Sequence, residues 1–230
     1  MAARIGIWLA IIALLTVAAA PLARMTLGLA PMPAFMIFVA GLGVGLLLAC
    51  AALIFTLAAA VSGVTAAWKR GLFVMVLGIL PFACVTVYLG PERVQSSLIH
   101  DISTDTDNPP LFQQARTMRK AADNSTTYGG AALAYPDIKP IYDDMSRDEA
   151  LTRVVQVVLG MNWTLVNADF ASGIVEAYDT TRVFALVDDI VIRVRSRGAG
   201  SRIDIRSASR ASPVNAGMNV ARIRRFIATF

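Results

Sequence analysis

The sequence predicts a membrane-anchored α+β protein, with three transmembrane helices followed by an extracytoplasmic domain whose antiparallel sheet is flanked by two helices. Before Glu92 the chain is almost wholly apolar and carries only four charged side chains. After Glu92 it becomes polar, and short runs alternate apolar and polar residues in the way that half-buried strands do. Hydrophobic residues make up 56% of the chain, which is too much for one ordinary water-soluble domain.

The apolar runs predict a transmembrane region over residues 1–90, with helices at about 5–23, 34–61 and 71–89. A helix needs about 20 apolar residues to cross the bilayer core, and each run is long enough. Ala18-Ala19-Ala20 resembles a signal-peptide cleavage site, so cleavage of the first run is the alternative to an uncleaved anchor. No ionisable residue lies within these spans, which argues against a transporter or channel.

Positively charged residues beside the spans predict the orientation. A cytoplasmic N-terminus places Arg4, Lys69 and Arg70 inside and Arg24 outside, whereas the reverse orientation places fewer cations inside. Three spans then deliver the chain after Leu89 to the outer face. In a bacterium we therefore expect a multi-pass protein of the cell inner (cytoplasmic) membrane with a periplasmic domain.

Two glycines in the second run, Gly41 and Gly45, form a small-xxx-small step. Such a step lets another helix approach closely. Two interpretations stay open, namely packing against another span of the same chain and formation of a homo-oligomer.

The polar part divides into two predicted segments. Residues 91–145 are rich in Ser, Thr, Asp and Pro, and we expect an extended linker with one short helix at Leu111–Ala122. Residues 146–230 are expected to form the α+β domain, and residues 98–145 to fold together with it. Alternating residues predict strands at Asn162–Ala168, Gly173–Tyr178, Asp189–Arg195 and Arg202–Ser209, with a further short strand or bend at Arg182–Val187.

Local signals predict two longer helices in this domain. Ser146 and Glu149 form a capping box, which begins a helix that ends near Gly160. A final helix is expected to begin at about Asn215, which is a good N-cap residue, and to run to the end of the sequence.

The hairpin around Gly198 makes a prediction about charge pairing. A symmetric turn places Arg193 opposite Asp204, which is favourable, and Arg195 opposite Arg202. The second pair is repulsive unless an anion or another carboxylate lies between the two guanidinium groups.

Charge is distributed unevenly along the polar part. Residues 92–181 carry seven basic and thirteen acidic residues, whereas ten Arg and three Asp follow from Arg182 onward. One interpretation is that the two halves pair with each other within one fold. The other is that an arginine-rich sheet face binds a partner protein, an anionic lipid headgroup or another anion. The candidate residues of that face are Arg193, Arg195, Arg202, Arg206 and Arg210.

An alternative candidate site is the polar cluster that lies before the predicted short helix. It contains the only histidine of the chain and three carboxylates within seven residues, namely His100, Asp101, Asp105 and Asp107. An enzyme of the envelope would use this cluster in a pocket beside the arginine strands. Turns in a structured extended segment explain the same residues equally well.

The sequence assigns no cofactor and no metal ion. Cys50 and Cys84 both lie in apolar runs, and the polar cluster lacks the glycine and the terminal glutamate of an EF-hand loop. Nucleic acid is an unsuitable partner, because a domain outside the cytoplasm does not meet it and the basic face lacks stacking aromatic residues.

Several strings in the polar part resemble the domain of unknown function 1499 family, which occurs in bacteria and chloroplasts. They are His100-Asp-Ile-Ser-Thr-Asp105, Pro109-Pro110, Tyr135-Pro-Asp-Ile138, Val187-Asp-Asp-Ile-Val-Ile-Arg193, Ile203-Asp-Ile-Arg-Ser-Ala-Ser-Arg210, Asn215 and Ala221-Arg-Ile-Arg-Arg-Phe226. The resemblance covers about residues 98–228. It implies an envelope protein with a lipoprotein signal or a few membrane spans, and it brings no activity, substrate or catalytic residues.

Overall fold

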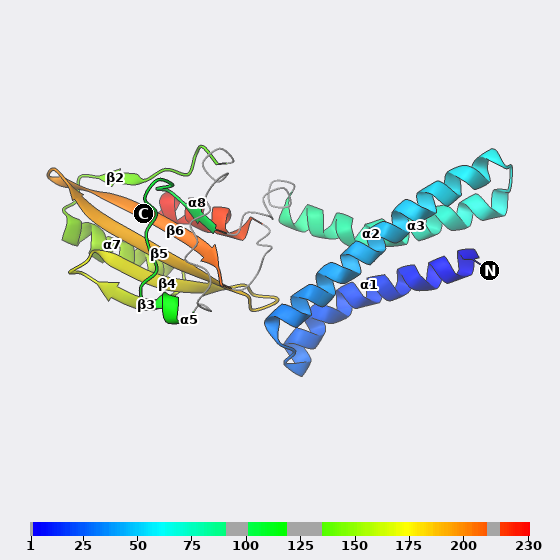
Figure 1. The fold of residues 1–230 in the computed structure, drawn as a ribbon, viewed down its shortest axis with the longest axis horizontal. Helices are drawn as coiled ribbons and strands as arrows, with labels where there is room; N and C mark the ends of the chain where they lie inside the picture. The colour runs from blue at the N-terminus through cyan, green and yellow to red at the C-terminus, as the bar shows by residue number, and fades with distance from the viewer. Residues whose placement is uncertain (1, 91–100, 119–134, 211–216) are drawn as a thin grey trace. The chain divides into compact units, whose positions relative to one another are not determined.

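The computed structural model describes residues 2–90, 101–118, 135–210 and 217–230 (Figure 1). It divides the chain into two compact units. The helical unit comprises Met1–Pro91 and Arg182–Phe184, and the sheet unit comprises Glu92–Thr181 and Ala185–Phe230.

The helical unit consists of α1 (Ala2–Leu27), α2 (Pro31–Val61) and α3 (Thr65–Leu89). All three helices are long and apolar enough to cross a membrane, as the sequence predicted. Proline begins α2 at a position where a missing N–H costs no hydrogen bond.

The boundary between the second and third helices differs from the prediction. The third helix was expected from residue 71, but it begins at Thr65. Gly63 has a φ of 72°, and this left-handed conformation ends the preceding helix within an otherwise apolar run. Lys69 and Arg70 therefore lie in the first turns of α3 and not in a connecting loop.

Glycines allow the three helices to pack closely. A Cβ atom at Gly41 would lie 2.9 Å from the Val17 side chain of α1, and one at Gly45 would lie 2.9 Å from the Gly78 carbonyl oxygen of α3. Contacts within one chain thus occupy the small-xxx-small step. Self-association through this step stays a prediction, and a second copy would have to displace these contacts.

The sheet unit holds six antiparallel strands in the order β1-β6-β5-β4-β3, and β2 also pairs with β6. Its elements are β1 (Asp101–Ser103), α5 (Ala115–Met118), β2 (Ile141–Asp143), α7 (Arg147–Gly160), β3 (Thr164–Asp169), β4 (Ile174–Thr180), β5 (Val187–Arg197), β6 (Gly200–Ser209) and α8 (Met218–Thr229). This arrangement confirms the predicted antiparallel sheet with two longer helices.

Helices α7 and α8 cover one face of the sheet and form the main core with it (Figure 1). The predicted capping box at Ser146 and Glu149 is present and begins α7. The apolar positions of β5 and β6 point into this core, as their alternation predicted, and are almost completely buried: Ile190, Ile192, Val194, Ile203 and Ile205.

The opposite face is covered by residues 101–118, which belong to the segment expected to fold together with the domain. The segment was expected to be an extended linker, but its start forms β1 and its Phe112 packs on Val191 and Ala208 of the sheet. β2 likewise lies within residues 91–145, where an extended linker was expected. Three residues of strand carry too little alternation to be recognised in a sequence.

Two predicted helix starts can be compared only in part. The short helix expected at Leu111–Ala122 begins at Ala115, and residues 119–122 lie outside the described residues. The final helix begins at Met218 after Gly217, and its predicted N-cap Asn215 also lies outside them.

Candidate functional site

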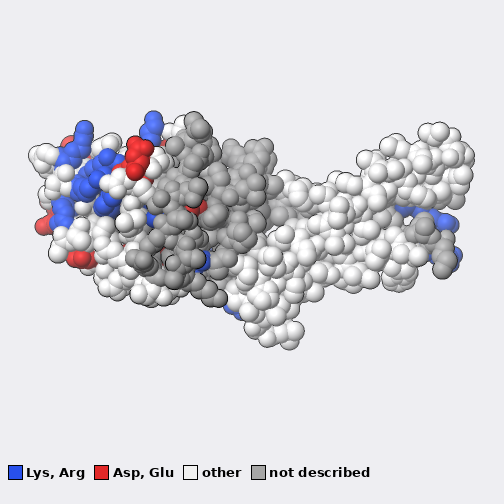
Figure 2. Space-filling view, in the orientation of Figure 1, with Lys and Arg blue, Asp and Glu red and all other residues white. Residues whose placement is uncertain are grey.

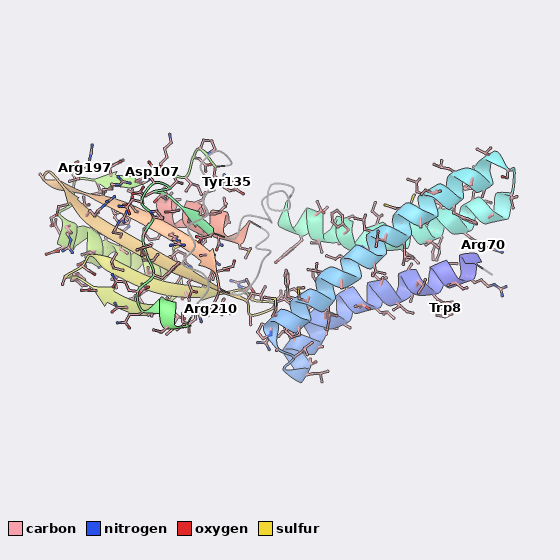
Figure 3. The ribbon with its side chains drawn as sticks, viewed as in Figure 1. Trp8, Arg70, Asp107, Tyr135, Arg197 and Arg210 are labelled. Atoms are coloured by element: carbon pink, nitrogen blue, oxygen red, sulfur yellow. The ribbon has the colours of Figure 1, made fainter. Side chains whose placement is uncertain are left out.

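The arginines predicted to share a sheet face do so. We call this face, opposite α7 and α8, the arginine face. Its basic side chains alternate with the buried core residues along β5 and β6, and β6 leads directly into the last of them. It carries Arg193, Arg195, Arg202, Arg206 and Arg210, the last of which is labelled in Figure 3.

The hairpin register is the one that the sequence predicted. Arg193 lies opposite Asp204, and Arg195 lies opposite Arg202. All three arginines hydrogen-bond to Asp204, whose side chain is completely buried. The distances to its carboxylate are 3.1 Å from Arg193 Nη2, 2.8 Å from Arg195 Nη2 and 2.8 Å from Arg202 Nε.

A second carboxylate, that of Asp105, lies among the same three guanidinium groups. Its Oδ2 accepts hydrogen bonds from Nη2 of each arginine, at 3.1 Å from Arg193, 3.2 Å from Arg195 and 2.8 Å from Arg202. Asp105 comes from the loop after β1 and is 8% exposed. It is the additional carboxylate that the repulsive pair Arg195–Arg202 required.

These five side chains, which we call the three-arginine cluster, carry one positive charge in excess. Arg195 and Arg202 are its most accessible members, with 39% and 27% of the side chain exposed. Burial acts to lower the pKa of Arg202, but its hydrogen bond to Asp204 and the charges of both carboxylates outweigh burial and raise it. Arg202 therefore stays charged at any physiological pH.

A further cation lies at the hairpin end beside the cluster. The guanidinium of Arg197 is exposed and sits 4.5 Å from the ring centroid of Tyr142, and that of Arg202 sits 6.0 Å from the same ring. Basic side chains gather on this end of the sheet unit, with Asp107 nearby (Figures 2 and 3). The aromatic ring holds both guanidinium groups without neutralising them.

The remaining two arginines of the face pair with single carboxylates. Arg206 is completely buried, donates to both oxygens of Asp101 at 3.0 and 2.7 Å, and also donates to the Pro110 carbonyl oxygen. Arg210 pairs with the buried Asp189, and this hydrogen bond, against the opposing effect of burial, raises the pKa of Arg210.

The covering segment is fixed to the sheet by its backbone as well. Thr104 exchanges hydrogen bonds with the backbone of Ile205, at 3.0 Å and 2.9 Å. The buried carboxylate of Glu176 accepts hydrogen bonds from the backbone N–H groups of Gln113 and Gln114, both at 2.7 Å. These contacts hold Asp101 and Asp105 in place over the arginines.

The structure therefore brings part of the predicted polar cluster onto the arginine face. Asp101 and Asp105 lie on the arginine face, whereas Asp107 is exposed and His100 lies outside the described residues. Pairing between the acidic and basic halves of the domain, one of the two interpretations of its charge distribution, is present in these contacts.

Sequence reasoning missed a buried network on the other face of the sheet. Arg222 of α8 is 3% exposed and pairs with Asp179 at 3.0 Å and Asp188 at 2.9 Å, and it also donates to Ser207 and Asn219. The sequence did contain a sign of this network, because Asp188 lies on the same face of β5 as the buried apolar residues. An acidic residue in such a position requires a buried partner.

Among the residues that the structure describes, no three His, Cys, Asp or Glu side chains are placed to hold a metal ion. The arginine face itself presents positive charges and hydrogen-bond donors, paired with carboxylates of the same chain.

A comparison with curated proteins found no match. A family model with the description "Protein of unknown function (DUF1499)" matches residues 101–230, which is more than half of the chain. The match begins at the first residue of β1 and ends with the chain, and it excludes the three apolar helices. The resemblance seen in the sequence is confirmed, and the chain belongs to the DUF1499 family.

Proposed function

We propose that this is a non-enzymatic envelope protein, held in the cell inner membrane by its three helices, whose sheet unit lies outside and binds an anionic group of a partner. The observation that carries the proposal is the composition of the three-arginine cluster. Three guanidinium groups share two carboxylates, so one positive charge has no counter-charge within the cluster.

Free hydrogen-bond donors support the same conclusion. In its hydrogen bonds to described residues Arg195 uses only Nη2, and Arg202 uses Nε and Nη2. Arg195 Nε and the Nη1 atoms of both residues therefore stay available to another acceptor. Planar guanidinium groups with adjacent donors suit carboxylate and phosphate oxygens.

Exposure restricts which arginines take part. Arg206 is completely buried and Arg193 has 15% of its side chain exposed, whereas Arg195, Arg202 and Arg197 reach the surface. We therefore assign the anion to these last three, beside Tyr142. The partner carries a phosphate or carboxylate group, either on a protein or on a lipid headgroup.

The test uses the full chain in detergent micelles, titrated with glycerol phosphate and followed by calorimetry. Arg195→Gln removes a charged donor that makes no hydrogen bond to the backbone, and we expect about tenfold weaker binding. Arg225→Gln on α8 is the matched control, because it removes the same charge from an exposed position outside the arginine face. Equal affinity of the two variants, or no binding by the wild type, would contradict the proposal.

The enzyme alternative stays a prediction. The carboxylates of Asp101 and Asp105 both accept hydrogen bonds from arginines, so both already serve to hold the covering segment on the sheet. If His100→Ala abolished function in cells while Arg195→Gln left it intact, the enzyme alternative would replace the binding module.

A further inference from the structure

A cavity of about 160 Å³ opens between the three helices of the helical unit. α1 contributes Gly6, α2 contributes Ala51 and Phe55, and α3 contributes Arg70 and Val74 to its wall. Apart from Arg70, the wall is apolar. The hollow is open on one side, since Ala51, Phe55 and Arg70 of its wall are exposed, so a molecule from the surroundings can enter it.

The cavity lies at the end of the unit where the cations gather. α1 and α3 both begin there, and these starts carry Arg4, Lys69 and Arg70. Basic side chains gather at this end in Figure 2, and Arg70 is labelled in Figure 3. The chain contains no Asp or Glu before Glu92, so the helical unit has no carboxylate of its own to pair with them. This contrasts with the arginine face, where each arginine has a carboxylate within 3.2 Å.

We propose that the cavity binds an anionic phospholipid, with its phosphate at Arg70 and part of an acyl chain against Gly6, Phe55 and Val74. An apolar hollow disfavours water, because water needs several polar partners. An acyl chain meets the apolar wall without that cost, and the phosphate supplies the charge that the helical unit lacks. Basic pockets between membrane helices are suited to anionic headgroups for this reason.

The general preference of membrane proteins for cations on one side of the membrane does not explain this site. That preference explains Arg4 and Lys69, but it does not require a hollow beside Arg70. Gly6, which has no side chain, also lines the hollow, and the nearest side chain to its Cβ position is that of Val74, at 3.7 Å.

The experiment is native mass spectrometry of the full chain, released from nanodiscs that contain equal amounts of phosphatidylglycerol and phosphatidylcholine. We expect one phosphatidylglycerol to be retained in preference to phosphatidylcholine. Arg70→Gln should weaken that retention about fivefold. Arg24→Gln is the matched control, because Arg24 lies in the last turn of α1 and does not line the cavity.

A second pair of variants tests the acyl chain separately. Ala51 is exposed on α2 and lines the cavity, so Ala51→Leu should reduce retention while the helices stay packed. Ala60→Leu adds the same side chain at an exposed position of α2 that does not line it. Equal losses for Arg70→Gln and Arg24→Gln would overturn the proposal, and so would unchanged retention in Ala51→Leu or equal retention of the two lipids.

Discussion

Replacing Asp105 by Asn is the sharpest test of how the arginine face is stabilised. The substitution keeps the size of the side chain but removes the charge shared by Arg193, Arg195 and Arg202. Asp204 is then the one carboxylate left within the three-arginine cluster, and an amide NH₂ can replace the oxygen that accepted from all three arginines. We expect the sheet unit to be strongly destabilised.

The magnitude follows from burial. Removing one partner of a buried ion pair costs about 3–5 kcal/mol, because the other charge stays buried without compensation. Here Arg195 has 39% of its side chain exposed and water can screen it, so we expect a smaller loss. A loss of about 2–3 kcal/mol in the free energy of unfolding, or roughly 10 °C in Tm, is consistent with this partial exposure.

Tryptophan fluorescence during urea unfolding measures the effect in the full chain. Trp163 is 3% exposed and stacks on Phe226, so it reports on the core of the sheet unit. Trp8 and Trp68 lie in the helical unit and are replaced by Phe in the background protein. Asp107→Asn, two residues from Asp105, is the control.

The Asp107 control should stay within about 0.5 kcal/mol of the parent protein, because its side chain is exposed. Phosphate should restore part of the stability of the Asp105→Asn variant more effectively than chloride at equal ionic strength, since an oxyanion can accept from several guanidinium groups. A loss no larger than that of the control would refute the reasoning, because Asp105 would then not offset the repulsion between Arg195 and Arg202.

Three further predictions concern other parts of the chain. Arg222→Met should cost about 3–5 kcal/mol in urea unfolding, because it removes the guanidinium that neutralises the buried Asp188. The hydrogen bond from Arg224 lowers the pKa of Asp137 below 3.8. The stabilisation that this ion pair gives to the folded state is therefore complete above pH 3.8, and it is lost as the pH falls through the lower pKa of the folded state. Arg224→Gln should flatten the unfolding free energy over that acidic range. Alkaline phosphatase fused after Phe230 should be active, because the predicted orientation places the end of the chain outside the cytoplasm. A fluorescent protein fused at the same place should stay dark, and cytoplasmic fluorescence would reverse the predicted orientation.

The register of the arginine hairpin could be predicted because side chains alternate strictly along a strand. Once Gly198 marks the turn, Arg193 must face Asp204 and Arg195 must face Arg202. The same geometry exposed a repulsion between Arg195 and Arg202, which Asp204 of the hairpin offsets only in part because it also pairs with Arg193. The sequence therefore indicated that another negative group was needed, although it did not identify which one.

Asp105 could not be assigned to that place, because the contact spans about 90 residues of sequence. A three-residue strand and a loop position it, and neither has a periodic pattern. Arg222 was missed for a related reason. On a helix rich in arginine, Arg222 looks like one more solvent-exposed charge. Its place beside the core positions Ile223 and Phe226, and its contact with Asp188 of β5, distinguish it from the exposed arginines.

The two units differ in how far carboxylates balance their positive charges, and this difference bears on function. In the sheet unit, each arginine of the arginine face contacts a carboxylate of the same chain, so the pairing first serves to fix the covering segment to the sheet. The cluster around Asp105 departs from neutrality by one charge, and that excess lies at the exposed end of the hairpin. In the helical unit, no acidic residue exists to balance the cations beside the cavity. Unbalanced positive charge thus occurs at two places with different surroundings, one polar and aromatic and the other apolar, which favours different anionic ligands at each.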